Sequence, residues 1–378
     1  MFNPGRVTRL DTSLLVSSPF YFGDRIAEQF ASHLKEIDFD RCFLVSSEKL
    51  IDLFGRDLLQ RIQKSGADCS LVQINDIERF KNWDTLRELC EELVARGVTK
   101  DSVLIALGGG MVGNVVGLAA ALVYRGIRFV HVPTTLTAQS DSTLSNKQAI
   151  NGARGKNQFG VYHAPLFVWA DAAYSRGEPR RQQQSGIVEG IKNVLISHDN
   201  ISGADQMLDL WTTDRWAELT LTIIQSKLQI IRDDPTEKKY GIILEYGHTF
   251  GHAIEWLSQG RLLHGEAVSI GMCLAAELSN SLGHMSDELL REHYRLLGER
   301  LGAPTRLPEW LEPQAVYNAM LADNKRTRHG LRFLLLRTCG QFVNPAEDYM
   351  TAVEPQIVLE CLRRHAGAGR DVARAARP

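Results

Sequence analysis

Ser102-Val-Leu-Ile-Ala-Leu-Gly-Gly-Gly-Met-Val-Gly113 carries the clearest structural signal in the chain, because an apolar run ends abruptly in three consecutive glycines. Residues 102–107 predict a buried parallel strand, and residues 114–123 continue as an apolar helix. Residues 108–113 match G-x-G-x-x-G at this strand-to-helix junction, where bare backbone and a helix N-terminus suit a pyrophosphate. The stretch therefore predicts an α/β domain that binds a dinucleotide.

The segments before this stretch repeat the same alternation of strand and helix. Strands are expected at 41–48 and 68–74, and helices at 51–64 and 85–97, a pattern typical of a parallel α/β sheet. The acidic residue that usually follows the glycines by about 20 positions is missing, so ordinary Rossmann topology is not expected. Glu48, at the end of an earlier strand, is a candidate partner for ribose hydroxyls, or it merely starts a helix.

The strand signal fades after Asp171, and residues 180–300 show mostly helical patterns, at 182–197, 211–232, 246–259, 267–282 and 287–301. We place a domain boundary near Pro179. The sequence then predicts an α/β domain at 1–179 and a mostly helical domain at 180–362. Residues 363–378 have a biased composition that predicts a disordered tail.

Length and composition restrict the class of protein. The chain has 378 residues, enough for two domains, with 44% apolar and 23% charged residues and a net charge of −2. This charge gives no electrostatic footprint for nucleic acid or a membrane surface, and no apolar run approaches the roughly 20 residues that span a bilayer. No secretory signal is visible, and the six cysteines are scattered without Cys-x-x-Cys. We expect a reduced, cytoplasmic protein.

A second signal lies at His248-Thr-Phe-Gly-His252, which is followed by His264. The first two histidines are four apart in a helical pattern, so they share one face, and His264 opens a second helix. Glu189, on another amphipathic helix, could add an oxygen ligand. Two histidines and one carboxylate leave an open position, as in catalytic zinc sites. The alternative is a structural or solvent-facing histidine pair.

Residues 141–157 are polar, contain glycine and are rich in small hydrogen-bond donors. The segment includes Lys147, Asn151, Lys156 and Asn157, side chains suited to holding a phosphate and sugar hydroxyls. The alternative is a solvated loop.

Seven motifs in one order resemble the dehydroquinate synthase family of sugar phosphate cyclases, over about residues 40–340. They are Gly-Gly-Gly-x-x-Gly, Tyr124-Arg-Gly126, Val132-Pro-Thr-Thr135, Asp141-Ser, Gly155-Lys-Asn157, Glu189-x-x-Lys192-Asn and Gly247-His-Thr-Phe-Gly-His-Ala. The resemblance implies an N-terminal Rossmann-like domain with tightly held NAD. It also implies a C-terminal, mostly helical domain with one divalent metal ion, zinc or cobalt, and a homodimer.

The resemblance also assigns roles to single residues. It implies that the metal ligands are Glu189, His248 and His264, with His252 beside them as a hydrogen-bonding or proton-relay group. The implied substrate and catalytic positions are Lys147, Lys156, Asn157, Lys192 and Asp141, together with Arg125, a phosphate-binding arginine that reaches across the dimer. The implied dinucleotide positions are Glu48, Glu78, Lys81, Gly108, Gly109, Gly110, Asn114, Thr134 and Thr135. Asn114 stands where dehydroquinate synthases carry an aspartate, and Lys227 and Lys325 fall loosely near positions of substrate contact.

Two further positions bear on the substrate. Dehydroquinate synthases grip a heptulosonate carboxylate with an arginine and an asparagine, where this chain has Gly241 and Glu245. Loss of the guanidinium and gain of a second anion disfavour a carboxylate substrate. The chain is instead similar to the branch of the family that cyclises glucose 6-phosphate to 2-deoxy-scyllo-inosose for aminoglycoside antibiotics. We give Glu245 the hypothetical role of orienting or deprotonating a hydroxyl near C1–C2.

Several alternatives stay open. Valiolone-type cyclases, which act on sedoheptulose 7-phosphate, commonly have proline at the position of His252, and dehydroquinate synthase itself is a further option. A metal-dependent NAD polyol dehydrogenase such as a glycerol dehydrogenase would form net NADH, but a simple polyol gives the lysines no phosphate to bind. A non-catalytic binding protein would have no need of the full set of metal ligands.

Overall fold

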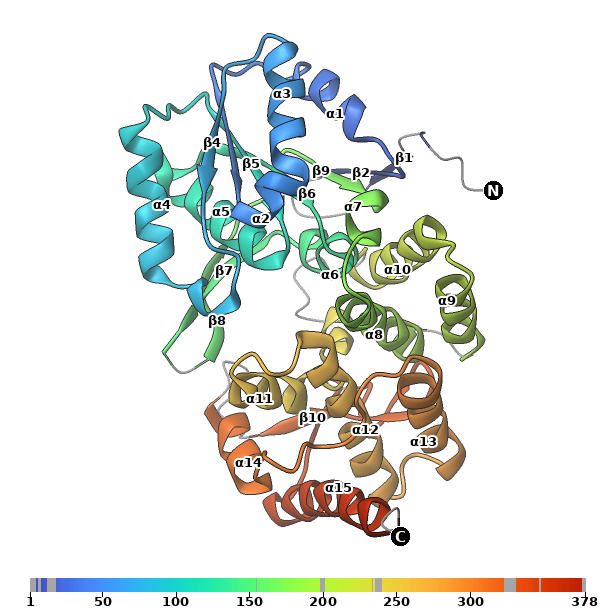
Figure 1. Cartoon of the computed structure of the whole chain (residues 1–378). Helices are drawn as coiled ribbons and strands as arrows, with labels where there is room; N and C mark the ends of the chain where they lie inside the picture. The colour runs from blue at the N-terminus through green and yellow to red at the C-terminus, as the bar shows by residue number, and fades with distance from the viewer. Residues whose placement is uncertain are drawn as a thin grey trace. The chain divides into compact units, whose positions relative to one another are not determined.

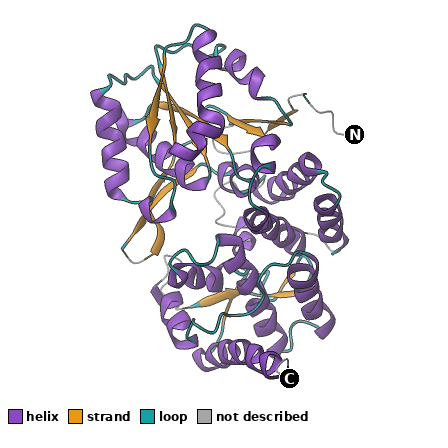
Figure 2. Cartoon of the chain, in the orientation of Figure 1, coloured by secondary structure: helices purple, strands orange, loops and turns teal. Residues whose placement is uncertain are grey.

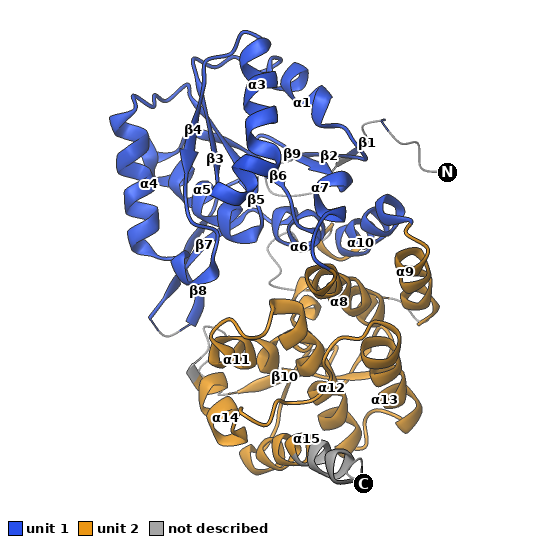
Figure 3. Cartoon of the chain, in the orientation of Figure 1, with its two compact units in different colours: residues 1–179, 215–228 blue, residues 180–214, 229–378 orange. Residues whose placement is uncertain are grey.

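The computed structural model describes residues 5, 8–11, 18–153, 155–197, 201–232, 234, 240–322, 331–346 and 348–375 (Figure 1). The chain divides into two compact units, residues 1–179 with 215–228, and residues 180–214 with 229–378 (Figure 3). Residues 215–228 therefore group with the N-terminal unit, although the sequence analysis places them after the boundary. Lys325 lies outside the described residues.

The first unit is built on a sheet in the order β1-β2-β9-β6-β5-β3-β4, in which β1 pairs antiparallel with β2 and the other pairings are parallel. Its strands are β1 (Thr8–Asp11), β2 (Pro19–Gly23), β3 (Cys42–Ser46), β4 (Cys69–Gln73), β5 (Val103–Gly108), β6 (Arg128–Pro133) and β9 (Val168–Asp171). Its helices are α1 (Ala27–Leu34), α2 (Glu48–Leu50), η1 (Ile51–Gly55), α3 (Arg56–Lys64), η2 (Glu78–Phe80), α4 (Trp83–Ala95), α5 (Gly110–Leu122), η3 (Val123–Arg125), α6 (Leu136–Ser140), η4 (Ser142–Leu144), α7 (Ala172–Arg176) and most of α10 (Trp216–Ile231).

Helices cover both faces of this sheet, which is why β3 and β5 are buried along their whole length. Alternate residues of β3 point to opposite faces. Phe43 and Val45 pack with α4 and α5, whereas Cys42 and Leu44 pack with α1 and α3. The predicted parallel α/β sheet is confirmed, and the continuous apolar runs reflect burial on two faces.

The order of the strands reverses between β3 and β5. From β3 the chain passes to β4 on one side and then returns to β5 on the other. If β3, β4, β5 and β6 are counted 1 to 4 along the chain, their order in the sheet is 2-1-3-4, which differs from the ordinary Rossmann order. Ligands of such sheets bind beyond the carboxyl ends of the strands at this reversal. Here those ends lead into Glu48 and into Gly108, so both predicted dinucleotide positions lie at the same edge of the sheet.

Strands β7 (Lys147–Gly152) and β8 (Gly155–Tyr162) pair as an antiparallel hairpin, in a region where a binding segment and a solvated loop are the two alternatives from the sequence. Gln148 and Ile150 are buried, and the residues on either side of each are less so. This period of two is the signature of a strand. It is weak in the sequence because one of the two buried residues is polar.

The second unit is mainly helical, as predicted (Figure 2). It contains α8 (Arg180–Ser197), α9 (Ser202–Thr212), η5 (Tyr240–Glu245), α11 (His248–Ser258), α12 (His264–Ser281), α13 (Asp287–Tyr294), η6 (Arg295–Arg300), α14 (Pro313–Ala322) and α15 (Pro355–Ala375). Two small antiparallel pairs join β10 (Arg332–Leu334) to β13 (Met350–Ala352) and β11 (Leu336–Thr338) to β12 (Gln341–Phe342). Helix α12 is buried along most of its length and packs against α8, α11, α13 and α15.

Two details correct the sequence analysis. The helix expected at 211–232 is broken between α9 and α10, where Asp214 adopts a left-handed conformation (φ 55°). The tail expected to be disordered from residue 363 begins as part of α15, since Cys361, Leu362 and His365 are buried along one side of that helix. Among the described residues, no helix is both long enough and apolar enough to cross a membrane.

Candidate metal centre

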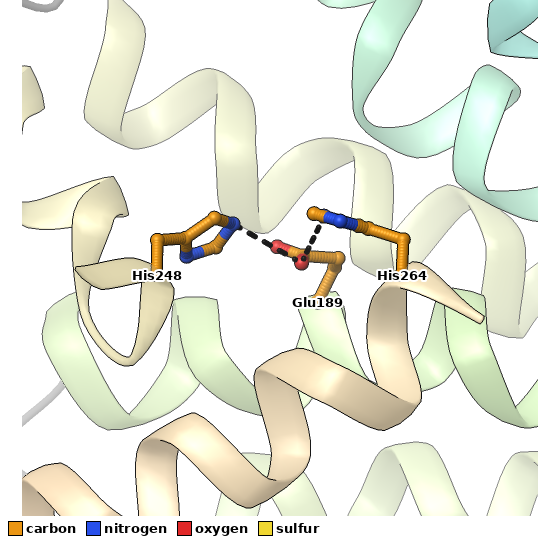
Figure 4. A group of neighbouring side chains, drawn as sticks. All are labelled: Glu189, His248 and His264. Atoms are coloured by element: carbon orange, nitrogen blue, oxygen red, sulfur yellow. Dashed lines mark ion pairs between the residues drawn. The ribbon is translucent and has the colours of Figure 1, made fainter. Parts of the chain in front are cut away.

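Glu189, His248 and His264 come together in the second unit, each from a different helix (Figure 4). Glu189 lies in the middle of α8, while the two histidines are the first residues of α11 and α12. One ligand atom of each lies within 4.8 Å of the others. The structure thus assembles the three residues that the resemblance assigns to the metal.

Glycines let these three helices approach backbone to backbone. A Cβ atom on Gly265 would lie 2.0 Å from the Ser185 carbonyl oxygen of α8, and one on Gly271 would lie 2.1 Å from the Gly247 carbonyl oxygen. Gly247 itself has φ 77° directly before His248, a conformation that favours glycine. The helix contacts that place the ligands therefore leave no room for side chains at these positions.

Glu189 offers one oxygen to both imidazoles. Its Oε1 lies 3.5 Å from Nε2 of His248 and 3.3 Å from Nε2 of His264, while Oε2 accepts a hydrogen bond from the buried Lys192 ammonium. Oε1 is buried and accepts no hydrogen bond within the described part of the chain. A buried carboxylate oxygen that accepts no hydrogen bond and faces two imidazole nitrogens suits coordination of a divalent zinc or cobalt ion.

Each histidine is oriented by a hydrogen bond on its other nitrogen. Nδ1 of His248 lies 3.1 Å from the Tyr246 carbonyl oxygen, and Nδ1 of His264 lies 3.0 Å from Glu255 Oε2. Donation from Nδ1 leaves the Nε2 lone pair for a metal ion, as is usual around metal sites. Glu255, which is not predicted from the sequence, lies nine residues before His264 on the last turns of α11.

Burial and charge oppose each other in this cluster. Burial would raise the pKa of Glu189, but Lys192, His248 and His264 outweigh it and hold that pKa well below its usual range. Burial and Lys192 depress the pKa of His248. Burial also disfavours the charged form of His264, but Glu255 and Glu189 outweigh it and raise its pKa to about 10. A metal ion has to displace the proton from His264.

Two other predicted residues, His252 and Glu245, belong to the same unit. The His252 ring is one turn along α11, with its centroid 5.1 Å from that of His248 and 6.1 Å from that of His264. It is not one of the three ligand residues. Glu245 ends η5 three residues before His248 and is half-buried. The ring of His252 therefore lies beside the two candidate ligand histidines.

The triple glycine of the first unit ends β5 and starts α5. A Cβ atom on Gly109 would lie 3.2 Å from the Thr135 side chain, and one on Gly110 would lie 3.2 Å from the Ser142 side chain. The backbone of the two glycines is therefore packed closely against these side chains. The buried hydroxyls of Thr134 and Ser142 make no hydrogen bond with described residues. Unsatisfied donors beside a glycine-rich helix N-terminus fit a pyrophosphate, as NAD would supply.

Residues assigned to the cofactor and residues assigned to phosphate meet in one network. Glu78 lies 3.2 Å from the Lys156 ammonium and accepts a hydrogen bond of 2.9 Å from the Asn151 amide. The buried Lys81 donates to Asn157 Oδ1 at 2.6 Å. The tip of the hairpin is therefore tied to the segment around η2, whereas Glu48 is exposed at the start of α2.

The remaining predicted residues also lie in the first unit. Lys227, on α10, donates to Asp141 Oδ1 at 2.6 Å and to its carbonyl oxygen at 3.0 Å. Lys147 is the first residue of β7. Arg125 is exposed in η3, where it and Tyr124 have positive φ. The structure thus joins Lys227 to a predicted catalytic residue.

Two protein-family models match this chain. The model of the 3-dehydroquinate synthase N-terminal region matches residues 71–185, and that of the 3-dehydroquinate synthase C-terminal region matches residues 186–326. The second match begins close to the start of α8 and includes the three candidate metal ligands.

Single relatives extend this likeness to most of the chain. A 2-deoxy-scyllo-inosose synthase from Streptomyces ribosidificus is 35% identical over 371 residues, 95% of this chain and 94% of the relative. A crystal structure of 2-deoxy-scyllo-inosose synthase complexed with carbaglucose-6-phosphate, NAD+ and Co2+ has a TM-score of 0.86 at 32% identity, covering 95% of this chain and all of that one. A 2-epi-5-epi-valiolone synthase from Streptomyces hygroscopicus, with NAD+ and Zn2+ bound, has a TM-score of 0.80 over 96% of this chain and 99% of that one, but at 23% identity it supports the fold alone.

Proposed function

Because this chain belongs to the 3-dehydroquinate synthase family, we propose that it cyclises glucose 6-phosphate to 2-deoxy-scyllo-inosose and releases phosphate. The observation that carries the proposal is the group formed by Glu189, His248 and His264, which could hold a metal ion. It occurs in a chain of which 95% aligns with a 2-deoxy-scyllo-inosose synthase. The reaction is a net elimination and carbon–carbon bond formation with no net change of oxidation state.

The bond changes balance without an external oxidant. The C6–O bond to phosphate breaks, and the C5 proton leaves with the phosphate. The C1–O bond of the sugar ring then breaks, so that the ring oxygen becomes a ketone at C5 and C1 becomes an aldehyde. A new bond joins C6 to C1, and the aldehyde oxygen becomes a hydroxyl. Bound NAD would supply reversible hydride exchange at C4, and a divalent ion held by Glu189, His248 and His264 would polarise the C4 hydroxyl. A ketone at C4 acidifies the proton on C5, which makes loss of phosphate possible. The phosphate's own oxygen is the base implied by the family.

The lysines of the first unit supply the phosphate contacts. Lys147 and Lys156 lie on the hairpin, and ammonium groups form strong charge-assisted hydrogen bonds with phosphate oxygens. Lys156 already pairs with Glu78, so it is held in place before a phosphate arrives. A leaving phosphate gains charge as its bond breaks, and a fixed cation stabilises that charge.

Residues of the second unit act on the sugar hydroxyls. Glu189 and the two ligand histidines hold the ion, and His252 lies close enough to their rings to donate or accept a proton at a hydroxyl of the sugar. Glu245 replaces the asparagine of dehydroquinate synthases, and a carboxylate accepts hydrogen bonds from hydroxyls but repels a substrate carboxylate. We assign Glu245 to a hydroxyl near C1–C2.

The lysine set also separates this proposal from a polyol dehydrogenase. The resemblance assigns Lys147, Lys156 and Lys192 to phosphate and ring hydroxyls, and a simple polyol has no phosphate for them. A valiolone-type cyclase is disfavoured by His252, and a dehydroquinate synthase by Gly241 and Glu245.

One assay tests the proposal. Protein loaded with NAD+ and Co2+ is incubated with glucose 6-phosphate, and released phosphate, NADH absorbance and the carbocyclic product are measured together. We expect phosphate and carbocycle in equal amounts and no accumulation of NADH. Parallel reactions with sedoheptulose 7-phosphate, a heptulosonate 7-phosphate and glycerol cover the alternatives. Net NADH formation with glycerol, or phosphate release from a different sugar alone, would overturn the proposed reaction.

We also propose that the enzyme works as a homodimer in the cytoplasm and serves aminoglycoside antibiotic biosynthesis. The exposed Arg125 supports a shared site, because the family's arginine at this position reaches a second subunit. The six cysteines are free thiols, which suits a reducing compartment. Sedimentation analysis tests the dimer, and a monomer that retains full activity would exclude the shared site.

A further inference from the structure

The hairpin that carries Lys147 is attached to α5 by an asparagine. Asn114 lies on the second turn of α5, where its Oδ1 accepts a hydrogen bond of 3.0 Å from the Ala149 backbone N–H of β7. Its Nδ2 donates to the Gly110 carbonyl oxygen at 2.8 Å. A carboxamide can accept on one side and donate on the other, whereas a carboxylate would turn a second acceptor toward the Gly110 carbonyl.

A second attachment lies one turn further along the same helix. A Cβ atom on Gly117 would lie 2.3 Å from Oε1 and 2.5 Å from Cδ of Gln148. Gln148 is 1% exposed, and its Nε2 donates to the His163 carbonyl oxygen at 3.2 Å, just after the end of β8. Gln148 therefore occupies a notch in α5 that exists only because residue 117 has no side chain.

These two contacts hold the two residues that directly follow Lys147. In β7, Gln148 faces the helix and fills the notch, while the N–H of Ala149 is fixed by Asn114. The side chain of Lys147 leaves the strand on the opposite side from Gln148. A shift of either contact moves the backbone from which the Lys147 ammonium extends.

We infer that Asn114 and Gly117 are positioning residues that set where Lys147 meets the substrate phosphate. The inference rests on the proposed function, which gives Lys147 that phosphate. It is distinct from a cofactor contact of Asn114, because Gly117 is covered by Gln148 and acts only through the hairpin. Misplacement of a binding group by about 1 Å can cost up to about 100-fold in rate.

The test is a double-mutant cycle between Gly117→Ala and Gln148→Ala in protein loaded with NAD+ and Co2+. We expect Gly117→Ala to raise KM for glucose 6-phosphate about tenfold with a much smaller change in kcat. In the Gln148→Ala background the methyl group has room, so adding Gly117→Ala should change KM less than about twofold. An equal effect of Gly117→Ala in both backgrounds, or none in either, would overturn the role of the notch.

Asn114→Asp provides a second, independent variant of nearly the same size. We expect it to raise KM for glucose 6-phosphate and to weaken inhibition by inorganic phosphate by similar factors, about tenfold. Cobalt content should not change, because the candidate metal ligands belong to the other unit. An unchanged KM would remove Asn114 from the inference.

Lys147→Ala separates failure of this inference from failure of the proposed function. If Lys147→Ala weakens phosphate binding while Gly117→Ala and Asn114→Asp do not, the positioning role is wrong and the proposed function stands. If Lys147→Ala leaves phosphate binding unchanged, the assignment of Lys147 is wrong and the inference falls with it.

Discussion

The candidate metal centre and the lysine-bearing hairpin are built in opposite ways. The metal ligands stand on helices that touch backbone to backbone at Gly247, Gly265 and Gly271, and the ligand atoms are largely buried. The hairpin has mostly exposed residues on β8 and is held by a few side-chain contacts, such as Glu78 with Lys156. A metal ion requires fixed geometry, whereas a flexible ammonium group on the exposed β8 strand, such as that of Lys156, can adjust to a phosphate.

The largest expected effect comes from removing a metal ligand. His248→Ala takes away one of the nitrogen donors that face Glu189 Oε1, so we expect loss of the bound ion and a fall in kcat of about 1,000-fold or more. Affinity for inorganic phosphate should persist, because Lys147 and Lys156 stand on the other unit. Metal analysis and steady-state kinetics measure both effects.

His252→Ala is the matched control, since it lies on the same helix but is not one of the three candidate ligands. It should keep the metal and lose turnover only. Loss of the ion from both variants would mean that the site extends beyond the three residues.

The next effect is on turnover without loss of metal. Glu245→Gln keeps the size of the side chain and one acceptor oxygen, but it replaces the other oxygen with an N–H donor and removes the charge. We expect kcat to fall about 100-fold, in the range typical of a lost general base, with metal content unchanged. Kinetics identical to those of the unaltered protein would take Glu245 out of the mechanism.

A smaller effect should follow from weakening the partner of His264. Glu255→Gln can still accept a hydrogen bond from Nδ1 but no longer supplies charge. We expect metal affinity to fall by about 10- to 100-fold, the usual cost of losing such a partner. Competition with a chelator measures the affinity. Glu255→Asp, which restores the charge on a shorter side chain, should recover part of it, and an affinity unaffected by either change would exclude Glu255 as an orienting group.

The smallest effects sharpen the contrast in stability between the two regions. Gly271→Ala pushes a methyl group toward the Gly247 carbonyl oxygen and should cost about 1–3 kcal/mol of unfolding free energy. Gly177→Ala, which meets nothing closer than 3.8 Å, should be neutral. Glu78→Gln breaks a partly exposed ion pair and should cost under about 1 kcal/mol. Denaturant unfolding compares the three, and equal costs would erase the distinction between rigid and adaptable regions.

The sequence predicts the parts whose signals are local. The apolar run before Gly108 indicates a buried strand, which the structure shows. The three histidines at 248, 252 and 264 indicate a candidate metal site on two helices, but their spacing does not say which two are ligands. The family resemblance selects His248 and His264, and the structure groups these two with Glu189. The tie between Asn114 and Ala149 is invisible in the sequence, because it depends on a strand packed against a helix 35 positions away. Glu255 is similar, since an acidic residue near the end of a helix normally faces solvent.

Other features were hidden by mixed patterns. Gln148 breaks the apolar alternation of β7, although it is buried as deeply as Ile150. In the tail, the arginines and glycines after residue 363 obscure the apolar face of α15, where Cys361, Leu362 and His365 are buried. The break between α9 and α10 depends on the left-handed conformation of Asp214, which any short polar segment could adopt.

The metal centre can be tested directly by anomalous diffraction from crystals grown with Co2+. We expect one strong cobalt peak per chain, within about 2.0–2.2 Å of a Glu189 carboxylate oxygen, His248 Nε2 and His264 Nε2. A cobalt peak bound elsewhere, or none with these three side chains turned apart, would contradict it.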